Sequence, residues 1–305
     1  MSKEVYDITI IGAGPAGCTA AIYSARRNLK TLLIEGKVIG GLFIDAGTIE
    51  NYPGFEKITG VELAEKFEKQ LKKLPVNLIY EKVEDIKKKN NLFEIKTNKS
   101  TFSSKSLIIT SGTRYREIEL KDEKRFVGRG ISYCATCDAP LFQGKDVAVI
   151  GGGNSAMHYA LHLAEICSKV YVIHRSEFRA DLILLEKLRK MKNVEFKQPY
   201  TVTELIGEKM LDSIKIKDSK TNKEETLKLS GIFISIGQDP NTNFLKNLEL
   251  KLNPSNYIEV NQNFQTNIPG VFAAGDVTAT AGQVIIAAGQ GAKAAMNAAA
   301  FLKEK

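Results

Sequence analysis

The stretch Asp7-Ile8-Thr9-Ile10-Ile11-Gly12-Ala13-Gly14-Pro15-Ala16-Gly17 determines the fold of this chain of 305 residues. A short run rich in β-branched residues leads into a glycine-rich turn, and an alanine-rich helical pattern follows to about Arg27. Strand, turn and helix in this order are typical of the start of a βαβ unit of the dinucleotide-binding kind. In such a turn Gly12 permits the tight bend, Gly14 lets backbone N–H groups approach a pyrophosphate, and Gly17 lets the helix pack on the strand.

An acidic residue follows the next strand of this unit. The strand at residues 31–34 ends at Glu35, which lies 23 residues beyond Gly12. This offset is close to the roughly 20 residues expected for the acid that binds a ribose hydroxyl in a dinucleotide fold. Glycine-rich turns also occur without any ligand, but the acid favours nucleotide binding by this one.

The same pattern recurs in the middle of the chain. A buried strand at residues 146–150 is followed by the turn Gly151-Gly152-Gly153-Asn154-Ser155-Ala156, by a helical segment, and by a strand at residues 170–173. His174 comes next, 23 residues beyond Gly151, at the position that Glu35 has in the first unit. The chain is therefore expected to contain two dinucleotide-binding units of the α/β class, which bind different nucleotides.

Two arginines follow the strand of the second unit. A carboxylate at this position favours the free 2′-hydroxyl of NAD or FAD, whereas a cation suits the 2′-phosphate of NADP. Arg175 and Arg179 supply such cations, and arginine offers paired donors that match phosphate geometry. NADPH is the preferred ligand on this reasoning, and surface ion pairs are the alternative role for both arginines.

Cys134-Ala135-Thr136-Cys137 is a CxxC motif, which is typical of a redox dithiol or of half a zinc site. His158 and His162 would share one helix face and give the zinc interpretation its support. The segment between Cys137 and His158 is too long for a zinc finger, so we expect a redox pair and no metal site. Asp138 then stands where it can transfer protons, with a helix cap as the alternative.

Bulk composition is that of an ordinary soluble protein, with 43% hydrophobic and 26% charged residues. The net charge of +8 arises from scattered lysines, so we expect acidic or phosphorylated ligands but no nucleic acid and no membrane. Cys18 and Cys167 are isolated and do not form a secreted disulfide framework. The apolar run near the start is too short for a signal peptide, and we expect a cytoplasmic protein.

With these motifs together, the sequence resembles the low-molecular-weight thioredoxin reductases over essentially its whole length. The resemblance rests on segments in the family's order: residues 12–17, Glu50-Asn51-Tyr52-Pro53-Gly54, residues 134–138, residues 151–156, and Gly275-Asp276-Val277. It implies an α/β fold of two Rossmann-like dinucleotide-binding domains, the second inserted in the first. Residues 1–115 and 242–305 would form the FAD-binding domain, residues 116–241 the NAD(P)H-binding domain with the CxxC motif, and the protein would be a homodimer.

The resemblance also implies a role for each matched residue. Cys137 would face the flavin, Cys134 would attack the disulfide of thioredoxin or a glutaredoxin-like partner, and Asp138 would be the acid. The residues expected to hold FAD are Gly12, Gly14, Pro15, Ala16, Glu35, Gly41, Asn51, Gly112, Gly275, Asp276 and Gln283. Those expected to hold NADPH are Gly151, Gly153, Asn154, Ser155, Ala156, His174, Arg175 and Arg179.

Several positions depart from the family pattern. Leu42 replaces a glutamine and Gly282 an arginine beside the FAD segments, and His158-Tyr159 replaces a glutamate pair. The family's paired arginines become Arg175-Ser176, and the loop to Arg179 is one residue shorter. NADH, a reduced deazaflavin and ferredoxin therefore stay open as electron donors.

Two other functions use the same residues. A flavin dithiol oxidase would discharge its electrons to oxygen, and a redox sensor or zinc protein would not catalyse a reaction. For the reductase, the second domain is expected to rotate on linkers near Gly112-Thr113 and Gly237-Gln238, so that nicotinamide and disulfide reach the flavin in turn.

Overall fold

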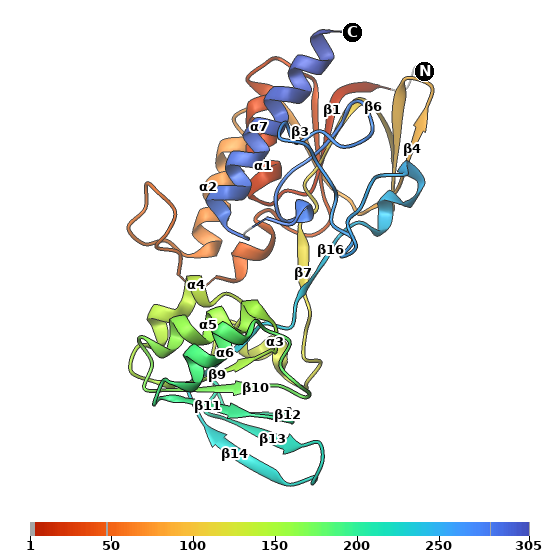
Figure 1. Cartoon of the computed structure of the whole chain (residues 1–305). Helices are drawn as coiled ribbons and strands as arrows, with labels where there is room; N and C mark the ends of the chain where they lie inside the picture. Colours follow the sequence, from red (N-terminus) through yellow and green to blue (C-terminus); the bar gives the residue numbers. More distant parts are fainter. Residues whose placement is uncertain (1–3, 47, 281, 305) are drawn as a thin grey trace. The chain divides into compact units, whose positions relative to one another are not determined.

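A computed structural model describes residues 4–46, 48–280 and 282–304 of the chain (Figure 1). The chain divides into two compact units, one of residues 1–114 and 239–305, the other of residues 115–238. The second is thus an insertion in the first. The divisions fall after residues 114 and 238, against the expected 115 and 241. The connecting strands β7 (Thr113–Tyr115) and β16 (Gln238–Pro240) pair with each other.

The first unit is built on a seven-stranded sheet in the order β3-β2-β1-β6-β5-β4, with β17 also paired to β6. Strands β1, β2, β3, β6 and β17 run parallel, whereas β4, β5 and β6 pair antiparallel. Their bounds are β1 Val5–Ile11, β2 Thr31–Glu35, β3 Val76–Tyr80, β4 Val83–Lys89, β5 Leu92–Thr97, β6 Thr101–Ile109 and β17 Val271–Ala273. The expected βαβ opening is present.

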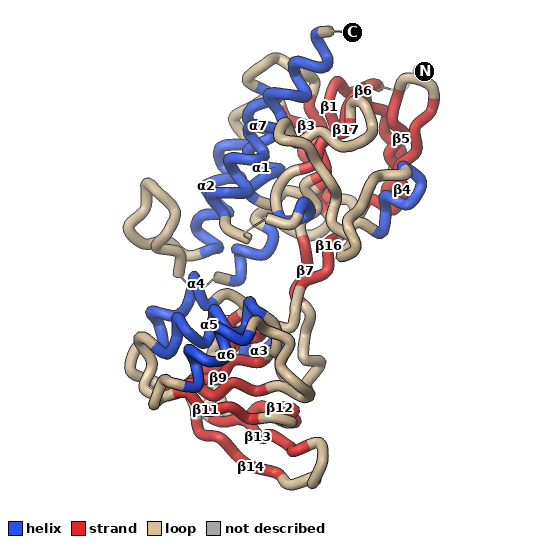
Figure 2. Tube along the Cα trace, in the orientation of Figure 1, coloured by secondary structure: helices blue, strands red, loops and turns tan. Residues whose placement is uncertain are grey.

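Three helices lie side by side along one face of this sheet (Figures 1 and 2). They are α1 (Pro15–Ala25), α2 (Gly60–Leu71) and α7 (Val284–Lys303). Small alanine side chains of α1 and α7 fill the core between them, which lets the two helices approach closely. The other face is covered by a second apolar core that includes the 3-10 helix η3 (Asn243–Leu248). Two more 3-10 helices are η1 (Gly41–Asp45) and η4 (Asp276–Thr278).

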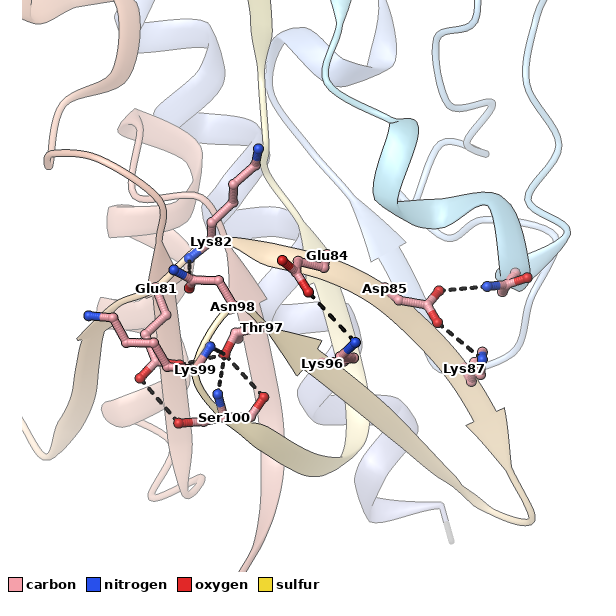
Figure 3. A network of polar contacts seen from close by, with 11 residues as sticks. Glu81, Lys82, Glu84, Asp85, Lys87, Lys96, Thr97, Asn98, Lys99 and Ser100 are labelled. Carbon is pink, nitrogen blue, oxygen red and sulfur yellow. Dashed lines mark hydrogen bonds and ion pairs between the residues drawn. The ribbon is translucent and has the colours of Figure 1, made fainter.

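The antiparallel edge of the first unit carries a polar network (Figure 3). Glu81 accepts hydrogen bonds from the hydroxyls of Thr97 at 2.5 Å and Ser100 at 3.2 Å. Lys96 pairs with Glu84 at 3.8 Å on the neighbouring strand. Positive charge on this hairpin is therefore interleaved with carboxylates.

The second unit has a five-stranded parallel sheet in the order β11-β10-β9-β15-β8. Its strands are β8 Ile131–Ser132, β9 Asp146–Ile150, β10 Lys169–Ile173, β11 Val194–Lys197 and β15 Gly231–Ile234. One face is covered by α4 (Ala135–Asp138), α5 (Asn154–Ala164), α6 (Leu182–Arg189) and the 3-10 helix η2 (Ala139–Phe142). The other packs against the antiparallel strands β12 (Tyr200–Ile206), β13 (Ser213–Asp218) and β14 (Glu224–Lys228) and the short helix α3 (Glu123–Phe126).

The first unit thus has a mixed sheet with a parallel part and an antiparallel edge, whereas the sheet of the second unit is parallel, and helices cover one face of each. Each unit contains the strand, glycine turn and helix that the sequence indicates. The fold class predicted from the sequence is confirmed. Among the helices that the structure describes, none is long and apolar enough to cross a bilayer.

Candidate functional site

The first glycine turn joins β1 to α1 and has the tight geometry that its residues allow. Gly12 has φ of +102°, and a Cβ there would lie 2.5 Å from the carbonyl oxygen of Thr110. A Cβ on Gly17 would lie 1.8 Å from the carbonyl oxygen of Gly12. Any side chain at either position would collide with backbone, so the turn requires glycine at both.

The same turn leaves room for a ligand at the start of α1. A Cβ on Gly14 would meet only the carbonyl oxygen of Gly40, at 3.9 Å. Gly14 is the N-cap, Pro15 and Ala16 form the first turn, and no side chain caps the helix. Uncapped N–H groups and the helix dipole together suit an anion such as a pyrophosphate.

Glu35 lies at the end of β2, next to this turn. Its carboxylate accepts the N–H of Ala13 at 2.7 Å and the N–H of Lys37 at 2.8 Å. The acid that the sequence places 23 residues beyond Gly12 is therefore brought to the turn. Its oxygens keep acceptor capacity for a ribose hydroxyl, since each carboxylate oxygen has two lone pairs.

Two further predicted residues of the first unit meet across a long sequence separation. The side-chain amide of Asn51 donates to Oε1 of Gln283 at 3.2 Å. Gln283 is the N-cap residue of α7, so the end of the chain is brought to the segment around residue 51. Gly41 and Gly112 have φ of +64° and +60°, with open space where a Cβ of Gly112 would lie.

Asp276 carries the clearest sign that a ligand belongs here. It follows β17 and Gly275, whose N–H donates to Gln290 at 2.9 Å. Oδ1 of Asp276 is buried and has no hydrogen-bond partner among the residues that the structure describes. Burial raises the pKa of this carboxyl. A buried polar atom without a partner is costly, and a polar ligand such as FAD would satisfy it. The residues of the first unit thus fit FAD.

The second glycine turn joins β9 to α5. A Cβ on Gly151 would lie 2.2 Å from the carbonyl oxygen of Ser235, whereas nothing lies within 4 Å of a Cβ on Gly153. Gly153 is the N-cap of α5, and Asn154, Ser155 and Ala156 form the uncapped first turn. This turn repeats the tight bend and the open helix start of the first one.

The loop after β10 folds onto this second turn. The N–H of Arg179 donates to the carbonyl oxygen of Gly152 at 2.8 Å, and the ring of His174 packs against Gly152. Asn154 and Asp181 form two hydrogen bonds, of 3.0 and 2.8 Å, which fix the end of the loop. The predicted residues of this unit are therefore close together.

The electrostatics of this loop favour a phosphate. Arg175 and Arg179 are exposed, and no ion pair to a carboxylate is present for either within the described ranges. Partial burial and the charges of Arg179 and Arg175 lower the pKa of His174. The imidazole is thus held neutral beside two cations. This arrangement suits a 2′-phosphate and speaks against the surface ion pairs considered as the alternative.

Cys134 and Cys137 form a disulfide, with 5.3 Å between their Cα atoms. Cys134 is the N-cap of the four-residue helix α4, which contains Cys137 and Asp138. Cys18 and Cys167 are free and buried, and burial raises the pKa of both thiols, that of Cys167 to about 11. The disulfide pair therefore fits a redox-active centre, whereas the two buried thiols do not.

Asp138 is held by a residue that the sequence reasoning did not select. The hydroxyl of Ser132 donates to Oδ2 of Asp138 at 2.6 Å and accepts the N–H of Cys134 at 3.1 Å. Burial raises the pKa of Asp138, and the hydrogen bond from Ser132 partly offsets this. The side chain bonds to a serine and does not cap α4. The one signal for Ser132 was a polar residue in an otherwise apolar strand start.

Tyr159 approaches the disulfide segment from α5. Its hydroxyl donates to the carbonyl oxygen of Tyr133 at 3.2 Å, directly before Cys134. His158 and His162 lie on exposed positions of the same helix. No group of three or more residues suited to a metal ion is found in the described part of the chain.

The sequence matches known proteins over nearly its whole length. The family model "Pyridine nucleotide-disulphide oxidoreductase" matches residues 6–295. A thioredoxin reductase of Mycoplasma genitalium is 40% identical over 276 residues, which cover 90% of this chain and 88% of that protein. A thioredoxin reductase of Bacillus subtilis is 37% identical over 308 residues, which cover 100% of this chain and 97% of that protein.

A solved structure is similar to the whole chain. The crystal structure of thioredoxin reductase from Streptococcus pyogenes superimposes with a TM-score of 0.94 at 36% identity, covering 100% of both chains. The same family is indicated by the fold, by the two glycine turns, by the CxxC disulfide and by these similarities. The chain belongs to the pyridine nucleotide-disulphide oxidoreductase family and, within it, to the low-molecular-weight thioredoxin reductases.

Proposed function

We propose that the chain is a thioredoxin-disulfide reductase, in which electrons pass from NADPH by way of FAD to the Cys134–Cys137 disulfide and then to oxidised thioredoxin. One observation carries the proposal. A CxxC disulfide beside a buried carboxyl group lies in the unit whose glycine turn faces two arginines without ion pairs in the described ranges. Family membership supports the same reaction.

The first unit would hold FAD through its glycine turn, Glu35, and the group of Asn51, Gln283 and Asp276. Gly14 and the open start of α1 would receive the pyrophosphate, and Glu35 a ribose hydroxyl. When bound, FAD supplies the two-electron exchange between a nicotinamide and a disulfide. Oδ1 of Asp276, buried and without a partner in the described residues, is available for a hydrogen bond with a polar group of the ligand.

The second unit would hold NADPH. Gly153 and the start of α5 would receive its pyrophosphate, while Arg175 and Arg179 would bind the 2′-phosphate. The neutral imidazole of His174 packs on Gly152 and holds the loop against the turn. The loop is the weakest match to the family pattern, so NADH, reduced deazaflavin and ferredoxin have to be tested beside NADPH.

The reduced cysteine pair would carry out the exchange with thioredoxin. The thiolate of Cys134 attacks a sulfur of the thioredoxin disulfide, which gives a mixed disulfide and a leaving thiolate. Asp138 provides the proton that this thiolate needs. Sγ of Cys137 then attacks Sγ of Cys134, and its thiol proton passes to the second thioredoxin sulfur as that sulfur departs. The CxxC disulfide forms again and thioredoxin leaves as a dithiol. Two electrons pass from the CxxC pair to thioredoxin.

The proposal also includes a rotation of the second unit, a homodimer and a cytoplasmic location. The CxxC motif and the second glycine turn belong to one unit, and the predicted FAD residues belong to the other, which supports a rotation about the linker strands β7 and β16. A cross-link between the linkers should slow turnover, and normal turnover in the cross-linked protein would contradict the rotation. A homodimer and a cytoplasmic location follow from the family resemblance.

Anaerobic absorbance measurements test the function. NADPH should bleach the flavin of the purified protein, and oxidised thioredoxin should restore it in wild type but not in Cys137→Ser. If only NADH, reduced deazaflavin or ferredoxin bleached the flavin, the proposed electron donor would be wrong, but the proposed reduction of thioredoxin would stand. Oxygen consumption driven by a dithiol without nicotinamide would replace the reductase by a dithiol oxidase.

A further inference from the structure

A buried serine connects the backbone at the first cysteine to the carboxyl group that follows the second. Ser132 lies in β8, which pairs with β15, and only 4% of the residue is exposed. Its hydroxyl donates to Oδ2 of Asp138 at 2.6 Å and accepts the N–H of Cys134 at 3.1 Å. All three groups belong to the second unit, so this geometry does not depend on the first.

The same hydroxyl can serve both protonation states of Asp138. Toward the ionised carboxylate it donates its hydrogen to Oδ2. When Oδ2 carries a proton, the carboxyl donates to Ser132, whose hydrogen can turn to the carbonyl oxygen of Cys134, 3.4 Å away. Oδ2 is therefore held in either state, while Oδ1 is buried without a partner in the described part of the chain.

The surroundings of Asp138 leave Ser132 as its polar anchor. The titratable group that faces it from α5 is Tyr159, whose hydroxyl donates to the carbonyl oxygen of Tyr133. Burial and the nearby charge of Asp138 raise the pKa of Tyr159, so the phenol is neutral at physiological pH. On its own segment Asp138 has Cys134 and Cys137, which are uncharged in the disulfide.

We propose that Ser132 is a positioning residue for proton transfer at the CxxC pair: its hydroxyl fixes Oδ2 of Asp138 to the backbone of Cys134. The inference rests on the proposed role of Asp138 as the acid. The inference adds that Ser132, which lies outside the CxxC motif, holds the carboxyl group of Asp138 in a defined position.

Reduction by dithiothreitol gives a test without thioredoxin or nicotinamide. A thiolate of the reagent attacks Sγ of Cys134, the S–S bond breaks, and Sγ of Cys137 leaves with the electron pair and takes a proton from Asp138. The second thiol of the reagent then displaces Sγ of Cys134, so the protein disulfide is reduced and the reagent oxidised. Quenching by alkylation and mass spectrometry of the intact holoprotein follow the reaction, because Cys18 and Cys167 are buried.

The readout is the rate divided by the concentration of reagent thiolate, measured across pH. In wild type this normalised rate should fall as Asp138 ionises. In Ser132→Ala the midpoint should move upward by about one pH unit, because a hydrogen bond that stabilised the carboxylate is lost. Ser132→Thr keeps a hydroxyl and should retain the wild-type midpoint, provided that its circular dichroism is native.

A matched control and a double variant separate the possible results. Ser213 is also a buried serine of this unit whose hydroxyl donates to a carboxylate, Asp212, at 3.4 Å, and Ser213→Ala should leave the profile unchanged. In an Asp138→Asn background, Ser132→Ala should have no further effect.

Each contrary result has its own meaning. A fall that persists in Asp138→Asn would remove the acid role on which the inference rests. A flat profile in Asp138→Asn with a wild-type profile in Ser132→Ala would overturn the positioning role of Ser132 alone. If Ser213→Ala moved the pH midpoint as much as Ser132→Ala, the shift would reflect general destabilisation of the unit and the proposal would be wrong.

Discussion

The two glycine turns follow the same path but differ at their third small residue. In the first unit this residue is Gly17, where a Cβ would lie 1.8 Å from the carbonyl oxygen of Gly12. In the second unit it is Ala156, which is fully buried and carries its Cβ beside Gly151. The helix thus approaches the turn more closely in the first unit. The same glycine-rich motif therefore accommodates two different distances between helix and turn.

The strand ends beside the turns differ in charge. Glu35 presents a carboxylate that the N–H groups of Ala13 and Lys37 hold, whereas the second unit presents a neutral His174 followed by the cations Arg175 and Arg179. The turns would bind the phosphates that both nucleotides share. The strand ends distinguish a ribose hydroxyl from a phosphate. The glycine turns therefore set where each nucleotide binds, and the residues at the strand ends set which nucleotide is bound.

The largest effect is expected from the third position of the turn. Gly17→Ala should destabilise the protein by about 3 kcal/mol or more and abolish retention of FAD, because the backbone must move to admit the methyl group. The matched change Ala156→Gly should cost about 2 kcal/mol, from the lower helix propensity of glycine and the loss of a buried methyl group. Chemical unfolding and flavin absorbance measure both. Equal effects would show that the two turns are packed alike.

A smaller effect should come from the cations of the second unit. Arg179→Ala should raise the KM for NADPH by about tenfold to a hundredfold and leave the KM for NADH unchanged, because only NADPH has the 2′-phosphate. Arg189→Ala, an exposed arginine at the end of α6, is the control. If both nucleotides lost affinity equally, Arg179 would act on the loop and not on the phosphate.

The smallest effect should appear in the pH dependence of stability. Burial raises the pKa of Asp138 in the second unit and of Asp276 in the first. An acid with a raised folded pKa favours folding at low pH, and this contribution is lost as pH rises from the ordinary value through the raised one. Asp138→Asn and Asp276→Asn should thus each stabilise the apoprotein by about 1 kcal/mol at pH 7.5 and have no effect at pH 3.5.

Urea unfolding at the two pH values checks this sign. A variant that is less stable than wild type at pH 7.5 would mean that its carboxylate is stabilised in the fold. If this happened at Asp276 but not at Asp138, the two buried acids would serve opposite electrostatic roles in the two units.

Sequence patterns predicted the strands, the turns and the CxxC pair because these depend on neighbours in the chain. The repeat of the glycine turn at residues 12–17 and 151–156 was enough to predict two α/β units. Ser132 escaped notice because its importance comes from a hydrogen bond to Asp138, six residues away and on another element. Its one signal, a polar residue in a short strand, does not reveal which side chain it binds.

The sequence by itself determined the class of fold, the two dinucleotide turns and the disulfide chemistry, since backbone conformation and sulfur spacing are local properties. Only the tertiary structure decided that Asn51 meets Gln283, that Asp276 keeps a buried oxygen without a partner in the described residues, and that Arg175 and Arg179 are free of carboxylates there. These depend on burial and on contacts between segments far apart in the chain. Desolvation and long-range packing, which set pKa values and leave oxygen atoms unpaired, exist only once the chain has folded.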